Sequence, residues 1–198
     1  NMCPYASPEC SAWCFGGVKR LSMKNTKTAR LVRSLLLQNE KEKYLEFLHN
    51  EIQYLVRKAE RDGLILALRM NGTSDKDFNR MGVYAKYPTV QFCEYTKNAG
   101  MIRKYVNGEL PSNLHLTLSR SELNHDFCME MLKTGKVNVA IPFYGEHPET
   151  FEGFPVVTGD DHDLRFLDPV GGHVIALKFK GYESRLKASK EKGFIVHV

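Results

Sequence analysis

Residues 114–142 read LHLTLSRSELNHDFCMEMLKTGKVNVAIP, and they contain two predicted strands with a predicted helix between them. Leu114–Ser119 alternates apolar and polar residues, which is typical of a strand with one buried face. Ser121–Thr134 opens with Ser-Glu and has the length of a helix, and Val137–Pro142 is a second apolar strand. The order strand, helix, strand is the unit from which parallel sheets are built.

The same order extends to both sides of this segment. Strand and helix patterns alternate over most of the chain, with about five or six strands, which is too few for an eight-stranded barrel. The sequence therefore predicts an α/β fold with an open parallel sheet or a partial (βα) barrel. The other strands are predicted at Leu64–Asn71, Thr89–Tyr95 and Val174–Lys180, with a looser segment that reaches Pro155–Val157. The other helices are predicted from Asn25 or Thr26 through Leu36, over Tyr44–Ala59 up to a Gly63 cap, and over residues 98–110.

The chain has 198 residues, which fits a single domain. We expect a cysteine-rich loop over residues 1–24 and an α/β core over residues 25–198. No stretch reaches the roughly 18 consecutive apolar residues of a membrane helix, so no membrane partner is expected.

The net charge of +5 is concentrated near the N-terminus. Residues 1–36 carry six basic side chains and one acidic side chain, so the rest of the chain is neutral. The segment Lys19–Arg33 is therefore either a solvated helix face or an edge that contacts the phosphates of a nucleotide, a cofactor or a nucleic acid.

Three of the five cysteines lie within the first 14 residues, as Cys3, Cys10 and Cys14. This C-x6-C-x3-C spacing can supply three ligands of a [4Fe–4S] cluster and leave one iron open. The same thiolates can hold three sides of a tetrahedral Zn²⁺ site. A disulfide framework and three unmetallated thiols are the remaining alternatives. The cluster is the leading interpretation.

The polar residues of the predicted strands share one face. The leucines of Leu114–Ser119 alternate with His115, Thr117 and Ser119, and the neighbouring strands alternate in the same way. A polar face on a parallel sheet is costly when it is dry and unpaired. The pattern favours a cleft or barrel lumen that binds a ligand over a hydrogen-bonded interior or a solvent-facing half-sheet.

Ligands of parallel α/β folds bind at the carboxyl ends of the strands. The polar residues that follow the predicted strands should therefore meet at one rim, together with the cysteine loop. Asp75 and Glu122 are candidates for acid–base catalysis or for binding hydroxyl groups. The candidates for cofactor binding are Arg69, Asn71, Ser74, Tyr95, Lys97, His115, Ser119, Arg120 and Lys178.

A further polar segment runs from Thr158 to Pro169. Its residues Asp161, His162 and Asp163, together with Asp160, could bind a divalent metal, hold ribose hydroxyls or transfer protons. The alternative is an acidic turn that makes local capping bonds.

Five motifs follow one another along the chain: Cys-Pro-Tyr-Ala-Ser-Pro-Glu-Cys with Cys14, Arg-Met-Asn-Gly-Thr-Ser-Asp at 69–75, Tyr-Thr-Lys-Asn at 95–98, Leu-Ser-Arg-Ser-Glu at 118–122, and Asp-Asp-His-Asp-Leu-Arg-Phe-Leu-Asp at 160–168. In this order they resemble a phage family that is described as gene product 88-like. The resemblance implies a phage or prophage origin and a bacterial cytoplasmic setting, and it brings no established activity.

The cysteine loop also resembles, more weakly, that of the radical S-adenosylmethionine enzymes. That resemblance implies a cluster on Cys3, Cys10 and Cys14 whose open iron binds S-adenosylmethionine. Its spacing departs from the C-x3-C-x2-C of those enzymes. By position alone, the implied cofactor contacts are Arg69, Asn71, Ser119 and Arg120.

Three hypotheses of function follow. The first is an iron–sulfur enzyme of radical S-adenosylmethionine type that acts on a nucleotide or nucleic-acid-related substrate. The second is a metal-dependent nuclease or nucleotide-processing enzyme with its chemistry at Asp160–Asp163 and a structural metal in the cysteine loop. The third is a non-catalytic phage protein that binds a host factor or nucleic acid.

Overall fold

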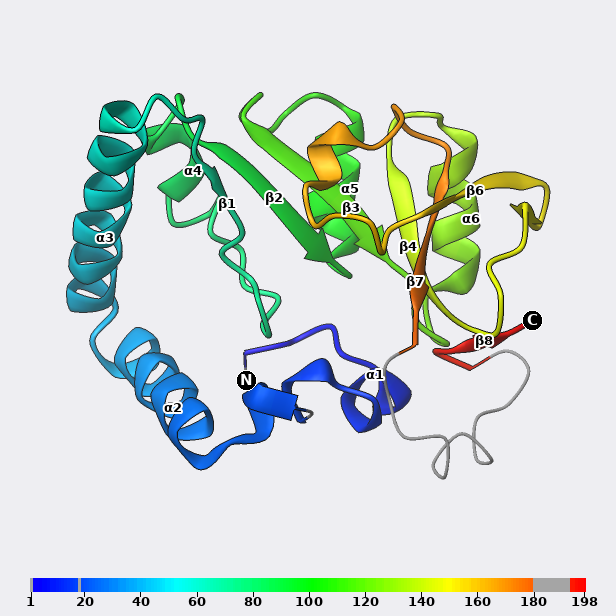
Figure 1. The fold of residues 1–198 in the computed structure, drawn as a ribbon, viewed down its shortest axis with the longest axis horizontal. Helices are drawn as coiled ribbons and strands as arrows, with labels where there is room; N and C mark the ends of the chain where they lie inside the picture. The colour runs from blue at the N-terminus through cyan, green and yellow to red at the C-terminus, as the bar shows by residue number, and fades with distance from the viewer. Residues whose placement is uncertain (1, 18, 180–192) are drawn as a thin grey trace.

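The structure, a computed structural model, describes residues 2–17, 19–179 and 193–198. Its centre is a sheet in which seven strands follow the order β1-β2-β3-β4-β7-β6-β5, and β8 pairs with β4 off that path (Figure 1). The strands are β1 (Ala67–Leu68), β2 (Gln91–Thr96), β3 (Leu114–Ser119), β4 (Asn138–Tyr144), β5 (Thr150–Phe151), β6 (Phe154–Thr158), β7 (Val174–Lys178) and β8 (Val196–His197). The helices are α1 (Pro8–Ala12), α2 (Lys24–Asn39), α3 (Lys41–Arg61), α4 (Val83–Lys86), α5 (Ala99–Val106) and α6 (His125–Lys133), with 3-10 turns η1 (Phe15–Gly17), η2 (Lys19–Ser22) and η3 (Arg165–Leu167).

Neighbouring strands are parallel except for the antiparallel pair β5 and β6. The predicted α/β class is confirmed, and of the two predicted arrangements the structure has the open, mostly parallel sheet, because the described strands do not close into a barrel. The sheet also has more strands than the predicted five or six. The additional strands β5 and β8 have two residues each, which is too short for a hydrophobic alternation to be read from the sequence. Lys180, the last residue of one predicted strand, lies outside the described residues.

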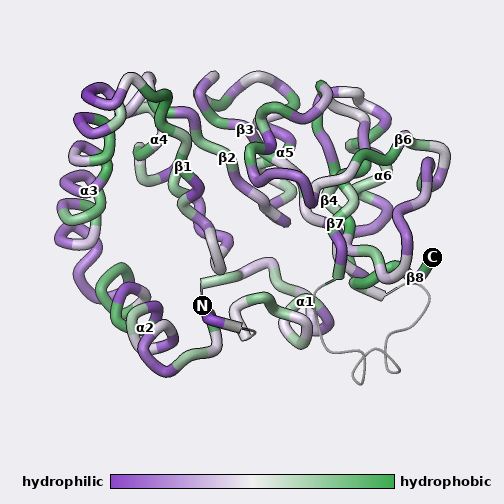
Figure 2. Tube along the Cα trace, in the orientation of Figure 1, coloured by the Kyte–Doolittle hydropathy of each residue, from purple (hydrophilic) through white to green (hydrophobic). Residues whose placement is uncertain are grey.

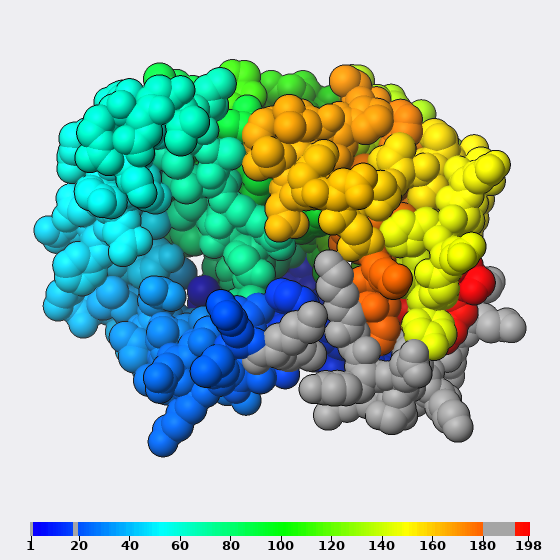
Figure 3. Space-filling model, in the orientation of Figure 1, coloured from blue at the N-terminus to red at the C-terminus, as the bar shows by residue number. Residues whose placement is uncertain are grey.

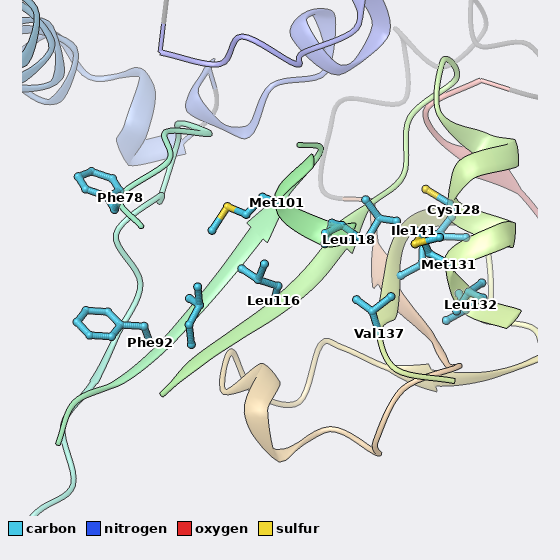
Figure 4. Close-up of a cluster of buried hydrophobic side chains, with 14 of the residues drawn as sticks. Phe78, Phe92, Met101, Leu116, Leu118, Cys128, Met131, Leu132, Val137 and Ile141 are labelled. Carbon is cyan, nitrogen blue, oxygen red and sulfur yellow. The ribbon is translucent and has the colours of Figure 1, made fainter. Parts of the chain in front are cut away.

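The apolar face of the sheet packs on helices, as the alternation predicts. Leu114, Leu116 and Leu118 of β3 are at most 3% exposed. They share one buried core with residues of α5 and α6, such as Met101 and Leu132 (Figure 4). Burial of each such side chain contributes about 1.5–3 kcal/mol to folding.

The opposite face carries the polar residues of the strands. The register places Tyr95 of β2 beside Thr117 of β3, and Thr117 beside Asn138 of β4. The segment that contains η3 contacts β3 and lies over this face (Figure 1). The predicted polar face is therefore present, but around Thr117, which is 0% exposed, it is covered instead of forming an open cleft.

Two long helices form an arm beside the sheet (Figure 1). Polar and apolar residues alternate around both of them (Figure 2), and α3 packs Ile52, which is 2% exposed, against the core. Gly63 ends α3 with a φ of 65°, a conformation that glycine adopts without the steric cost of a Cβ atom. Its amide donates to Glu60 O and the amide of Leu64 donates to Ala59 O, which is the Schellman pattern.

The predicted buried strand Leu64–Asn71 is wrong over most of its length. Leu64 and Ile65 are 67% and 87% exposed, and only Ala67–Leu68 pairs with β2. Beyond Leu68, the backbone amides of Met70 and Asn71 bond to a side chain of β2 in place of its backbone. The apolar run lies at the edge of the sheet, where a strand has one partner only.

The side chain that replaces strand pairing is the buried carboxylate of Glu94. It accepts hydrogen bonds from Met70 N at 2.7 Å, Asn71 N at 2.9 Å and the hydroxyl of Tyr84 at 3.3 Å. Burial raises the pKa of Glu94 to about 7, although the two amides, Arg69 and the tyrosine hydroxyl favour the charged form. The folded protein therefore binds this proton more tightly than the unfolded chain does.

We expect the stability of the protein to depend on Glu94 between about pH 4.5 and pH 7. The unfolding free energy falls as the pH rises through this window, by up to about 3 kcal/mol, because the folded state must release a proton that it holds more tightly than the unfolded state does. Urea unfolding at several pH values measures this slope, which the Glu94→Gln variant should lack. Equal slopes in both proteins would show that other groups set the pH dependence.

Candidate functional site

The N-terminal segment lies against the carboxyl ends of the central strands, as predicted (Figure 1). The thiol of Cys3 lies 3.6 Å from Thr73 O, and the amide of Asp75 donates to Met2 O at 2.9 Å. Both partners belong to the loop that follows β1. These two contacts place the first cysteine at the rim where ligands of parallel sheets bind.

The carboxylate of Glu122, which follows β3, holds the short helix α1. It accepts from the hydroxyl of Ser7 at 2.6 Å and from the amide of Glu9 at 2.9 Å. Ser7 is also the N-cap of α1, and its hydroxyl accepts from the amide of Cys10 at 3.1 Å. A carboxylate at a helix N-terminus satisfies amides that have no partner inside the helix. Glu122, which we predicted to be catalytic, therefore positions the helix that carries Cys10.

The three N-terminal thiols lie close enough together to affect one another. Burial raises the pKa of Cys3, and Cys14, Asp75 and Cys10 raise it further by charge repulsion, whereas Lys97 lowers it. All five cysteines lie in the described part of the chain, and none forms a disulfide there. The loop therefore gathers three thiols beside one lysine.

The backbone between Cys14 and α2 is fixed by an arginine of the basic segment. The guanidinium of Arg30 donates to Gly16 O at 2.8 Å and to Leu21 O at 2.9 Å. A Cβ atom at Gly16 would lie 2.5 Å from Arg30 Nη1 and 3.4 Å from Cys14 Sγ, so a larger residue there would displace the end of the Arg30 side chain. Arg30 thus binds the cysteine loop, and this part of the predicted phosphate-contacting edge has a structural role.

Asp75 and Lys97 meet at the same rim. The carboxylate of Asp75 accepts from Thr96 Oγ1 at 2.7 Å and from the amide of Lys97 at 2.9 Å. The ammonium group of Lys97 donates to Ser119 Oγ at 3.0 Å and lies 5.6 Å from the ring centroid of Phe194. The structure therefore brings these predicted site residues together.

Two other predicted cofactor ligands are buried in structural bonds. Arg120 is 2% exposed and donates to Gly193 O and to His125 Nδ1, both at 2.9 Å. Asn71 is 5% exposed, and its side chain bonds the amide and carbonyl of Lys76 and the hydroxyl of Ser74. These residues shape the rim, and their bonded groups do not face a ligand.

A second group of predicted residues lies on or beside the polar face of the sheet. Tyr95 is part of this face, and the exposed side chain of Arg69 lies over it, with the guanidinium carbon 4.6 Å from the centroid of the tyrosine ring. Burial raises the pKa of Tyr95 to about 12. Burial, with the charge of Arg165, lowers the pKa of His115, whose Nδ1 lies 3.5 Å from the Tyr105 hydroxyl.

The acidic segment is held both by a local contact and by β7. His162 contacts the guanidinium of Arg165 through its backbone oxygen and its Nδ1 atom. The carboxylate of Asp160 accepts from the amide of Lys178 at 2.9 Å and lies 3.7 Å from His147 Nε2, and Lys178 is exposed at the end of β7. Asp161 and Asp163 are exposed. A role for Asp161, His162 and Asp163 in catalysis remains a prediction.

Two buried charged residues were not predicted as part of any site. Arg165 is 1% exposed, and its Nη1 lies 3.4 Å from Asp168 Oδ2. The spacing Arg-Phe-Leu-Asp is a signal for this i, i+3 pair. Glu94 shares its face of β2 with Phe92 and Thr96, so a carboxylate on the apolar face was already visible in the alternation.

Over the described residues, no three histidine, cysteine, aspartate or glutamate side chains stand in a ready arrangement for a metal ion. The three thiols of the loop are neighbours without forming such a group. In the same part of the chain, the search for a helix long and apolar enough to cross a bilayer found none.

The open parallel sheet with a three-cysteine loop at its carboxyl edge defines an α/β protein with a candidate thiolate site. The family comparison then identifies the chain: it belongs to the family described as Gene product 88, which matches residues 1–197. This confirms the predicted phage gene-product family. Comparisons with curated proteins and with solved structures gave no match, so the radical S-adenosylmethionine resemblance has no support from them.

We expect Glu122→Ala to release α1 from the rim. The change removes two hydrogen bonds to a charged group, each worth about 1.5–3 kcal/mol. Trp13, the single tryptophan, packs edge-on against Phe179 with ring centroids 5.3 Å apart. Its emission should shift to the red, and Cys10 and Cys14 should react faster with a thiol reagent.

Glu130→Ala is the matched control, because Glu130 is exposed on α6. It should leave both the emission and the thiol rates unchanged. The same emission and rates in Glu122→Ala as in the native protein would contradict the structural role of Glu122.

Proposed function

We propose that Cys3, Cys10 and Cys14 bind an iron–sulfur cluster at the carboxyl edge of the sheet. We further propose that the protein is an enzyme that acts on a nucleotide or nucleic-acid-related substrate. The observation that carries the proposal is that three cysteines within 14 residues lie on a loop that hydrogen bonds hold at the carboxyl edge of the sheet.

The chemistry of the donor set supports the proposal. Thiolate sulfur is a soft ligand that iron–sulfur clusters and zinc take up, and a metal binds the deprotonated form of each cysteine. Cys3, Cys10 and Cys14 supply three such sulfur atoms from one short loop.

The anchoring of the loop supports the same proposal. Glu122 holds α1 from a position 113 residues away from Glu9, and the carboxylate of Glu9 accepts from the amide of Phe194 at 2.6 Å. The three thiols thus belong to a segment that is bonded both to the sheet and to the C-terminal residues. Such support from surrounding hydrogen bonds is what metal ligands require for fixed orientation.

With three protein ligands, a [4Fe–4S] cluster keeps one iron that can take a small ligand. S-adenosylmethionine is the ligand that we propose for it. The exposed guanidinium of Arg69, stacked on Tyr95, is the candidate to hold a carboxylate or phosphate of that ligand.

Anaerobic purification with iron, sulfide and zinc analysis tests the proposal. We expect a brown protein with about four iron atoms per chain, and loss of both colour and iron in Cys10→Ser. The matched control is Cys93→Ala, since Cys93 is a buried cysteine of β2. It should retain the iron.

Two results would contradict the proposal. Stoichiometric zinc without iron would make the loop a zinc site. Full retention of iron in Cys10→Ser would exclude the loop as the cluster ligand. If the cluster forms, its absorption spectrum should change when S-adenosylmethionine is added, and no change would remove that ligand from the proposal.

A further inference from the structure

A pocket of about 460 Å³ lies next to the cysteine loop. Pro4 and Tyr5 of that loop line one side of the pocket, and Lys41, the first residue of α3, lines another. The remaining lining residues come from the segment after β1 and from the start of α5: Asp75, Lys76, Asp77, Arg80, Met81 and Asn98. In Figure 3 the surface is hollowed where the N-terminal segment and the helical arm meet the segment that follows β1.

Three cations line this pocket. Lys41, Lys76 and Arg80 make no ion pair with a carboxylate within residues 2–17, 19–179 and 193–198. The two carboxylates of the pocket are engaged: Asp75 accepts from Thr96 and Lys97, and Asp77 accepts from the amide of Arg80 at 2.9 Å. With three cations against two carboxylates, the lining carries a net charge of +1.

The backbone of Lys76 is held at the pocket wall by hydrogen bonds. The side chain of Asn71, which is 5% exposed, accepts from the amide of Lys76 and donates to its carbonyl, both at 2.9 Å. The buried turn thus holds Lys76 at the pocket wall. Asn98 caps α5, and its carbonyl oxygen accepts from Met101 N at 3.1 Å, so the positive end of that helix faces the same region.

An aromatic ring completes the lining. Tyr5 is 46% exposed and stands two residues after Cys3. Exposed aromatic rings beside cations are the elements with which proteins bind bases and phosphates together. A volume of about 460 Å³ falls within the range of small-ligand pockets, roughly 300–1,000 Å³.

We propose that this pocket binds a nucleoside phosphate, with the phosphates on Lys41, Lys76 and Arg80 and the base on Tyr5. Binding in the pocket stands on its own observations, whereas its role as the substrate site rests on the proposed function. The pocket would then present the nucleotide directly beside the cysteine loop.

Calorimetric titration of the intact protein with ADP, pyrophosphate and adenosine tests the assignment. ADP should bind more tightly than either pyrophosphate or adenosine, and its affinity should fall as the salt concentration rises. The double variant Lys41→Gln with Arg80→Gln should bind ADP at least about tenfold more weakly. Its control is Arg57→Gln with Lys104→Gln, which replaces two exposed basic residues outside the pocket.

The tyrosine is tested separately. Tyr5→Ala should weaken ADP binding by about tenfold and leave pyrophosphate binding unchanged, because it removes a stacking surface and no charge. Tyr54→Ala, at a position that is 61% exposed on α3, is the control and should bind both probes like the native protein. A melting temperature for each variant confirms that it is folded.

Three results would overturn the assignment: no ADP binding by the folded native protein, undiminished binding in the lysine and arginine double variant, or pyrophosphate bound as tightly as ADP. The metal proposal is judged independently. If the protein binds ADP and contains no iron, the cluster proposal fails and the pocket assignment stands. If it contains iron and binds no ADP, the pocket assignment fails and the cluster proposal stands.

Discussion

The bonds of the Glu122 carboxylate to Ser7 and Glu9 connect the N-terminal segment to the end of β3. Met2, Cys3 and the carboxylate of Glu9 add further hydrogen bonds to the rest of the protein, whereas α1 has no buried residue of its own. This attachment fixes the position of Cys10, brings Cys14 near the other two thiols and places Trp13 where it packs. The candidate site is therefore held by directional hydrogen bonds more than by apolar burial, which makes it sensitive to single polar substitutions.

Many polar residues of the rim build the site without being free to react. Asp75, Asn71 and Arg120 each have their side-chain groups engaged with backbone or neighbouring side chains. The carboxylate of Glu94 on β2 accepts hydrogen bonds from the segment after β1 and so connects the two. The three thiols of the loop and the cations of the adjacent pocket lie at the same edge of the sheet.

The sequence was most informative where a pattern was long and periodic. The alternation in Leu114–Ser119 predicted both the strand and the face that packs on helices, and the spacing in α3 predicted its buried stripe. The prediction failed at Leu64–Asn71. An apolar run does not reveal that its strand lies at the edge of a sheet, or that its backbone amides donate to the side chain of Glu94. The roles of Glu122 and Arg30 were also hidden, because their partners are distant in sequence or are backbone atoms.

The central claim is that the loop at the carboxyl edge of the sheet holds a metal centre. Anomalous diffraction at the iron and zinc absorption edges, from crystals of anaerobically purified protein, tests it most directly. The account predicts an iron signal bonded to the sulfur atoms of Cys3, Cys10 and Cys14 beside Thr73 and Lys97. Ordered thiols with no anomalous signal at either edge would contradict it.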